Sequence, residues 1–258
     1  VRPSDSFFCE NGSYTVYDRT IHDTSKHGWL TFQQIIKFSS NIGASKVGEK
    51  MGKERFYRYI SAFGFGEKTG INLPGEGKGI LRHPRYWPPV ALDTISFGQG
   101  ISVTGIQLVT ALSAIANGGF LMKPYVVEKI TNEKGEVVQS FQPKTIRKVV
   151  SGETAKKVTM LLKATTEKGG TGEGAVPAGY EVAGKTGTAQ KVDSLLGGYS
   201  QDRYTSGFIG FAPSDEPKVV LLVVIDEPQG NNYGGVVAAP IFRAIIEKVL
   251  PYLHVVPK

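Results

Sequence analysis

The stretch Gly179-Tyr-Glu-Val-Ala-Gly-Lys-Thr-Gly-Thr-Ala189 decides which fold the chain adopts. From Gly179 to Thr186 it satisfies the pattern of a phosphate-binding P-loop, and the apolar run ending at Asp226 resembles the strand whose aspartate holds magnesium in nucleotide hydrolases. If the same residues form a strand, they present Lys185-Thr186-Gly187 along a sheet edge. The flanking residues distinguish these two interpretations.

A P-loop requires an apolar strand directly before its first glycine, because the loop projects from the end of that strand. Residues 168–178 instead hold several glycines and a proline, which favour a loop. Tyr180 and Val182 would fall inside the flexible phosphate loop, although both residue types are common in strands. The sequence therefore favours the strand, and a P-loop nucleotide hydrolase remains a remote alternative.

Three strands are predicted around this stretch, over residues 180–188, 204–211 and 218–225, all rich in β-branched and aromatic side chains. Residues 212–217 contain Pro, Ser and Asp, which favour a turn, so the last two strands should form an antiparallel hairpin. A closing helix is predicted over residues 239–250. Helices followed by neighbouring strands and a final helix are typical of an α+β fold.

The earlier part of the chain is predicted to be helical. Thr31 can cap a helix over residues 32–38, and further helices are expected over 42–51, 53–63, 102–117 and 151–167. In the fourth of these, apolar side chains recur at steps of three, which predicts a buried stripe: Val103, Ile106, Val109, Leu112 and Ile115. The break at Ser39-Ser40-Asn41 should lie between two helices.

Composition sets wider limits. The chain has 258 residues and a net charge of +7, but its basic residues are spread out, which fits a solvated surface at least as well as a dedicated anion-binding patch. Cys9 is the single cysteine, and His22, His27, His83 and His254 do not fall at metal-ligand spacings. We expect no metal, no cofactor and no nucleic-acid partner.

Two short motifs suggest a catalytic site. Lys-Thr-Gly at 185–187 and the single Ser-x-Asn at Ser39-Ser40-Asn41 are two of the three elements found in penicillin-binding proteins and serine β-lactamases. Each is weak alone: Ser39 and Asn41 are equally able to cap the next helix, and Lys185 to be an exposed strand lysine. A second Lys-Thr-Gly, Lys68-Thr69-Gly70, lies among loop glycines and is predicted to be structural.

Longer stretches carry a specific resemblance, in the order His27-Gly-x-Leu-Thr31, Ser39-Ser-Asn-x-Gly43, Phe63-Gly-Phe-Gly-x-x-Thr-Gly-Ile71, Ile95-Ser-Phe-Gly-Gln-Gly-Ile-Ser-Val-Thr104 and Ala183-Gly-Lys-Thr-Gly-Thr-Ala189. These resemble the class B penicillin-binding proteins, most of all the cell-division transpeptidase. The resemblance implies a penicillin-binding transpeptidase (β-lactamase-like) fold, an antiparallel five-stranded sheet with helices on both faces. We expect residues 1–258 to form part of one such domain.

The chain departs from that family in one respect. No serine stands three residues before any lysine, so the nucleophilic Ser-x-x-Lys motif is missing. In the family this motif precedes Ser-x-Asn, and only 38 residues precede Ser39 here, so we expect it upstream of Val1 in a longer parent protein. The chain alone is then expected to be inactive, with a void near the sheet. A catalytically inactive scaffold or binding module is the alternative.

The resemblance also implies roles for individual residues and for the parent protein. Ser39 would relay a proton, Asn41 would hold the substrate amide, and Lys185 would supply positive charge. Thr186, Gly187 and Thr188 would bind the substrate, with the Thr188 N–H as one oxyanion donor. The implied partners are peptidoglycan stem peptides, β-lactam antibiotics and divisome or elongation proteins. A membrane anchor would lie upstream, with the catalytic domain on the periplasmic or extracytoplasmic face of the cell membrane.

Overall fold

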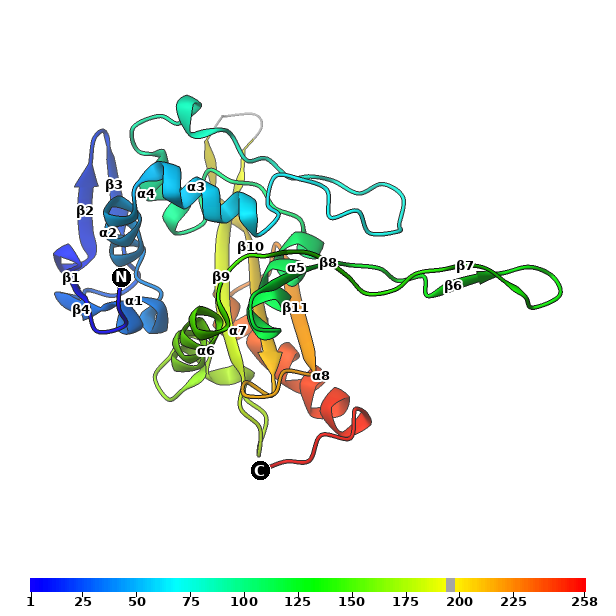
Figure 1. Ribbon diagram of the computed structural model, residues 1–258. Helices are drawn as coiled ribbons and strands as arrows, with labels where there is room; N and C mark the ends of the chain where they lie inside the picture. The colour runs from blue at the N-terminus through cyan, green and yellow to red at the C-terminus, as the bar shows by residue number, and fades with distance from the viewer. Residues whose placement is uncertain (194–197) are drawn as a thin grey trace.

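A three-stranded antiparallel sheet forms the centre of the computed structural model, which describes residues 1–193 and 198–258 (Figure 1). Its strands are β9 (Ala183–Val192), β10 (Tyr199–Ala212) and β11 (Val219–Asp226), in the order β11-β10-β9. In the register of the sheet, Phe208 lies opposite Thr186 on one side and Val223 on the other. Strand β9 is therefore an edge strand, and its free edge carries the Lys-Thr-Gly motif.

Helices cover both faces of this sheet. Successive side chains of β10 point to opposite faces, so this strand contributes to a core on each side. Phe208 packs in one core cluster with Phe242 and Ile246 of α8 (Ala239–Tyr252). Phe211 packs in another with Ile115 of α5 (Gly105–Ala116), and α6 (Gly152–Thr166) packs beside it. The short α7 (Gly234–Val237) and the 3-10 helix η3 (Glu173–Ala175) complete the layer around α8.

The N-terminal part has a separate core. Two ribbons, β1 (Ser6–Phe8) with β4 (Trp29–Thr31) and β2 (Ser13–Val16) with β3 (Arg19–His22), flank the 3-10 helix η1 (Glu10–Gly12). They pack against α1 (Phe32–Phe38) and α2 (Asn41–Met51), followed by α3 (Lys53–Ala62). The fully buried members of this core are Cys9, Ile35 and Ile42.

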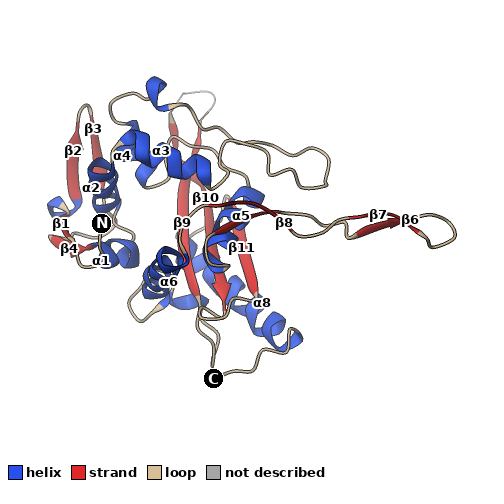
Figure 2. Ribbon diagram, viewed as in Figure 1, coloured by secondary structure: helices blue, strands red, loops and turns tan. Residues whose placement is uncertain are grey.

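A long ribbon projects from the rest of the molecule (Figure 2). Strand β5 (Phe120–Lys123) pairs with β8 (Lys144–Lys148), and beyond them β6 (Lys129–Thr131) pairs with β7 (Val137–Ser140). We call residues 124–143 the arm; every residue of β6 and β7 is exposed. Two further elements, η2 (Pro84–Tyr86) and α4 (Ala91–Ser96), contact α3 and α2, respectively.

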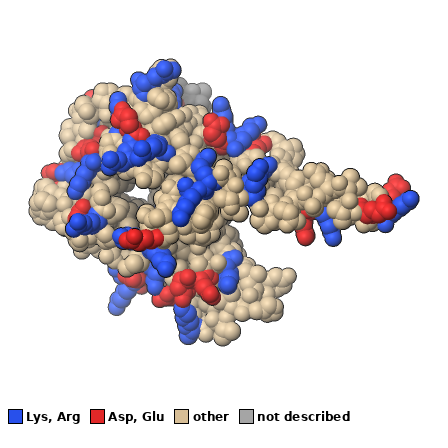
Figure 3. Space-filling model, viewed as in Figure 1, with Lys and Arg blue, Asp and Glu red and all other residues tan. Residues whose placement is uncertain are grey.

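Most predicted elements are confirmed. The antiparallel hairpin of β10 and β11 forms, Thr31 caps α1 through the Gln34 N–H, and Ser151 caps α6. The P-loop alternative is wrong, because Ala183 to Gln190 pair with β10 instead of forming a loop. Figure 3 shows Lys and Arg side chains scattered among acidic ones over the face in view, as their spread along the sequence predicts.

Two expectations need correction. The five-stranded sheet is a three-stranded one in the described residues, since no further segment there pairs with the edge of β9 or β11. The predicted apolar stripe is also not the most buried face of α5: Gln107, Thr110, Ala111 and Ala114 are more buried than Ile106 or Val109. Small side chains let the helix approach closely, and the larger ones fill its flanks.

No helix among residues 1–193 and 198–258 combines the length and the apolar character that a membrane span needs.

Candidate active site

The free edge of β9 meets the break between α1 and α2. Lys185 donates from Nζ to the Ser39 hydroxyl oxygen at 2.7 Å, although the two residues are 146 positions apart. The same ammonium group donates to the Thr186 carbonyl at 3.2 Å and to the Thr186 hydroxyl at 3.3 Å. The structure thus brings the two predicted motifs into direct contact.

Ser39 has its position because α1 ends there. Its backbone is left-handed (φ 58, ψ 44) and its N–H caps the helix at the Ile35 and Ile36 carbonyls. The residue that caps α2 is Ser40. Its hydroxyl oxygen accepts from the Gly43 N–H at 2.9 Å, and its O–H donates to the Asp23 carboxylate at 2.6 Å. Because Ser40 caps the helix, the Ser39 hydroxyl is left for Lys185. The alternative that Ser39 caps α2 is therefore wrong.

Asn41 is the first residue of α2, and its Nδ2 donates to the His22 carbonyl of β3 at 2.9 Å. This bond fixes the orientation of the amide and leaves its oxygen directed elsewhere. Asn41 lines a cleft of about 690 Å³ together with Thr188 of β9. The N-terminal core and the central sheet therefore each contribute one wall of the same cleft.

Burial gives Lys185 an unusual titration. Loss of hydration lowers the pKa of its ammonium group from 10.5 to about 8, and no ion pair with an acidic side chain opposes this shift in the described part of the chain. At neutral pH the amine is still mostly protonated. It therefore supplies positive charge but releases a proton far more readily than an exposed lysine.

The glycine-rich loop before β9 ties the two motifs together, a role that sequence reasoning missed. Thr186 donates from its hydroxyl to the Thr171 hydroxyl at 3.1 Å, and the Thr171 N–H donates to the Lys37 carbonyl in the last turn of α1 at 3.3 Å. A side chain on Gly170 or Gly172 would contact other atoms at under 3.0 Å. Close packing of this loop explains its glycines and places Thr171 between α1 and β9.

The hydroxyl groups of Thr186 and Thr188 differ in what they can offer a ligand. The Thr186 proton is committed to Thr171, whereas the Thr188 hydroxyl oxygen accepts from the Gly234 N–H at 3.2 Å and keeps its own proton to donate. Between them, a Cβ added to Gly187 would meet no atom within 4 Å. Along this part of β9 there is space for another backbone to approach.

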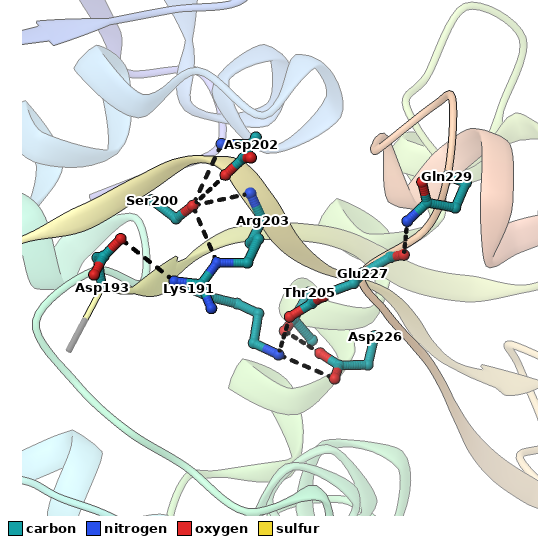
Figure 4. A network of polar contacts seen from close by, with 9 residues as sticks. All are labelled: Lys191, Asp193, Ser200, Asp202, Arg203, Thr205, Asp226, Glu227 and Gln229. Atoms are coloured by element: carbon teal, nitrogen blue, oxygen red, sulfur yellow. Dashed lines mark hydrogen bonds and ion pairs between the residues drawn. The ribbon is translucent and has the colours of Figure 1, made fainter. Parts of the chain in front are cut away.

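The charge of the cleft is positive. Its ionisable lining consists of Arg19, His22 and three tyrosines, with no carboxylate among the described residues that line it. Gln190 of this lining is followed along β9 by Lys191, which belongs to an ion-pair network (Figure 4). An anionic ligand group suits such a cleft.

That network ties the far ends of all three central strands (Figure 4). Lys191 of β9 contacts Asp226 at 3.0 Å and Glu227 at 2.8 Å, and Thr205 of β10 donates to Asp226 at 3.1 Å. Beside it, Arg203 pairs with Asp193 at 3.4 Å. These contacts hold β9 in register beyond the Lys-Thr-Gly motif.

The second Lys-Thr-Gly has a local role, as predicted. The N–H and hydroxyl of Thr69 both donate to one oxygen of the Glu76 carboxylate at 2.6 Å, and the Gly70 N–H donates to the other at 3.0 Å. The carboxylate of the same loop therefore occupies this motif.

Comparison with known proteins is consistent with this geometry. A family model described as "Penicillin binding protein transpeptidase domain" matches residues 1–247. Stage V sporulation protein D of Bacillus subtilis is 44% identical over 234 residues, which make up 90% of this chain and 36% of that protein. The peptidoglycan D,D-transpeptidase FtsI of Buchnera aphidicola is 35% identical over 251 residues, 95% of this chain and 42% of its own length. The chain spans less than two thirds of the length of these relatives.

Solved structures agree with the fold. The transpeptidase domain of penicillin-binding protein 3 from Burkholderia pseudomallei matches with a TM-score of 0.88 and 35% identity, over 99% of this chain and 74% of that one. Penicillin-binding protein 3 from Mycobacterium tuberculosis, complexed with aztreonam, matches with a TM-score of 0.91 and 32% identity, over 100% of this chain and 59% of that one.

Proposed function

The chain belongs to the transpeptidase domain family of penicillin-binding proteins, and we propose that it supplies most of the active site of a serine D,D-transpeptidase that cross-links peptidoglycan stem peptides. The observation that carries the proposal is the 2.7 Å contact between Lys185 and Ser39. It joins the Lys-Thr-Gly strand to the Ser-x-Asn turn at the edge of a positively charged cleft.

In the proposed reaction, a serine from a Ser-x-x-Lys segment outside residues 1–258 attacks the penultimate D-Ala carbonyl carbon, and a lysine takes its proton. The oxyanion forms against the Thr188 N–H. The C–N bond to the terminal D-Ala then breaks, and the leaving amine takes a proton relayed by Ser39. Attack of an acceptor amine on the acyl ester transfers the peptide and restores the serine.

The binding residues follow from the same edge. The donor peptide adds to β9 as a strand where Gly187 leaves space, and Asn41 holds its amide. The terminal carboxylate lies near Lys185 and accepts from the Thr188 hydroxyl. β-Lactams carry a comparable carboxylate beside a reactive carbonyl, and penicillin-binding protein 3 of Mycobacterium tuberculosis has been solved with aztreonam and with ampicillin.

The wider setting is proposed on the same basis. Two of the relatives are named stage V sporulation protein D and FtsI, and we expect the parent protein to act on the extracytoplasmic face of the cell membrane with divisome or elongation proteins as partners.

The test compares this chain with a longer one. A protein extended through the Ser-x-x-Lys segment should be labelled by fluorescent penicillin, and the Ser39→Ala variant of it should label at least about tenfold more slowly, in line with the usual contribution of a proton-transfer group. The 258-residue chain should show no penicillin adduct by intact-mass measurement. Failure of the extended protein to label would overturn the proposal.

A catalytically inactive scaffold is the second candidate, since Ser-x-x-Lys is missing from the 258 residues. The sequence of the parent gene separates the two: a Ser-x-x-Lys before Val1 supports the enzyme, and its absence there supports the scaffold.

A further inference from the structure

A second cavity, of about 490 Å³, adjoins the proposed active-site cleft, and we call it the outer chamber. The two cavities share six lining residues: Val90, Thr94, Gln99, Gly100, Gln190 and Tyr199. Tyr199 marks the boundary, where its hydroxyl oxygen accepts from the Gly100 N–H at 3.0 Å. The cleft therefore continues past this contact into the outer chamber.

The wall of the outer chamber is held in place from the protein interior. Gln107 of α5, 1% exposed, donates from its side chain to the Glu67 and Lys78 carbonyls at 2.8 and 2.9 Å. Ile80 bridges to Ser102, and the Trp87 indole N–H donates to the Arg82 carbonyl at 2.7 Å. Because these bonds fix its backbone and indole ring, the outer chamber is formed before any ligand binds.

The charge of the outer chamber comes from one residue. Arg82 is the single charged side chain in its lining, beside Trp87 and several aliphatic residues. Within the described ranges Arg82 takes part in no ion pair, and no carboxylate lines either cavity. An anionic group beside an apolar stem would match this lining.

The direction of the proposed substrate leads to the same place. If the terminal carboxylate lies near Lys185 and Thr188, an antiparallel strand added to β9 carries its earlier residues toward Gln190 and Val192. Both of these residues line the outer chamber. The residue that precedes the two terminal D-Ala units is the first whose long side chain reaches past Tyr199.

We propose that the outer chamber binds the side chain of this third stem-peptide residue, and that Arg82 selects a side chain ending in a free carboxylate. The parent enzyme then prefers a diamino dicarboxylic acid at this position over lysine or over the amidated form of the same residue. This inference rests on the proposed function and deepens it.

The two tryptophans of the chain allow a direct test. Trp87 lines the outer chamber, whereas Trp29 of β4 lines neither cavity and reports on non-specific effects. The 258-residue chain is labelled with 5-fluorotryptophan, and the Trp29→Phe variant assigns the two ¹⁹F resonances. Two synthetic pentapeptides are titrated, one with the free side-chain carboxylate at the third residue and one with that carboxylate amidated.

We expect both peptides to shift the Trp87 resonance, with a dissociation constant about fivefold lower for the free carboxylate, the size typical of one exposed ion pair. The preference should disappear at about 0.5 M NaCl, where such pairs are screened. Arg82→Gln should abolish it. Arg85→Gln is the matched control, since Arg85 is exposed, lies over Tyr86 and lines neither cavity, so the preference should remain.

Equal dissociation constants for the two peptides, or a preference that persists in Arg82→Gln, would overturn the inference and leave the proposed function standing. No shift of Trp87 with either peptide would likewise overturn the inference, whereas the proposed function is tested separately by penicillin labelling of the extended protein.

Discussion

Two opposing influences act on the pKa of Lys185. Its ammonium group contacts a serine and a threonine hydroxyl, which favours the charged form, while burial disfavours that form and lowers the pKa to about 8. The group therefore changes charge within the range in which an enzyme operates. Binding of a carboxylate at this edge should weaken as the pH rises above about 8.

The first prediction concerns this titration. After ¹³C reductive methylation, one lysine resonance should titrate near pH 8 and vanish in Lys185→Arg. The unfolded chain holds this proton up to about pH 10.4, whereas the folded chain loses it earlier, so stability should rise with pH in between. The free energy of unfolding of the wild type should therefore increase relative to Lys185→Arg between pH 8 and 10. A constant difference across this window would contradict the assignment.

The second prediction concerns Thr171. In Thr171→Val the Thr186 proton loses its acceptor, and we expect the free energy of unfolding to fall by about 1–2 kcal/mol, as for other hydrogen-bond partners lost in partly buried sites. Thr171→Ser keeps the hydroxyl and should lose less than about half of that. Urea denaturation measures both variants. A loss in Thr171→Ser that equals or exceeds the loss in Thr171→Val would contradict the assignment, because valine keeps the methyl group and serine keeps the hydroxyl.

At the scale of elements, α7 positions the strand that carries the motif. Gly234 begins this helix, and a side chain there would lie 2.2 Å from the Gly207 carbonyl oxygen and 2.6 Å from that of Gly187. The Gly234 N–H also donates a hydrogen bond to the Thr188 hydroxyl oxygen. The close approach of α7 to β9 and β10 therefore depends on one residue without a side chain.

The third prediction compares two glycines. Gly234→Ala should lower the free energy of unfolding by at least about 2 kcal/mol, because backbone atoms must move. Gly187→Ala should leave stability within about 0.5 kcal/mol, since its new methyl group meets open space. In the extended protein, however, Gly187→Ala should slow penicillin labelling, because in the proposed function that space receives the ligand. Urea denaturation and labelling rates separate the two effects.

Strands and helices could be predicted from the sequence where residues that favour an element also stand at the positions expected for it. Thr31 and Ser151 are cap residues before helices, and β10 and β11 are dense in β-branched and aromatic residues around a turn. The prediction for β9 began too early, at Tyr180, because tyrosine is common in strands; its hydroxyl instead donates to the Val255 carbonyl outside the sheet. Contacts of this kind depend on tertiary structure and leave no local pattern.

The same limit applies to the site. The residues of the two motifs were found from the sequence, but not the contact of Thr171 with α1 and β9 or the capping by Ser40. Both serines of Ser39-Ser40 are good cap residues by type. Only the left-handed turn at Ser39 decides which of them caps and which meets Lys185.

At the scale of the whole molecule, the site lies between two separate cores. One holds Ile35 and Ile42 beneath Ser39, and the other holds Phe208 and Phe242 beneath β9. Contacts between α1 and α6, together with the Thr171 link, connect the two. The distance between Lys185 Nζ and the Ser39 hydroxyl therefore depends on how these two cores pack against each other.

The arm takes no part in either core, which leads to the fourth prediction. The Phe141 N–H donates to the Glu128 carbonyl at 2.8 Å, so an Asn-Gly turn can replace residues 129–140. Since every residue of β6 and β7 is exposed, the melting temperature should change by less than about 3 °C. Calorimetry of the shortened chain measures this. A larger loss would show that the arm supports β5 and β8.

Ser39 holds a left-handed backbone in which glycine would be free of strain and most other side chains cost about 1 kcal/mol or more. Glycine at this position would therefore relieve the backbone strain. It would keep the fold and lose the hydroxyl that meets Lys185. At Ser39, backbone strain and the contact with Lys185 thus favour different residues.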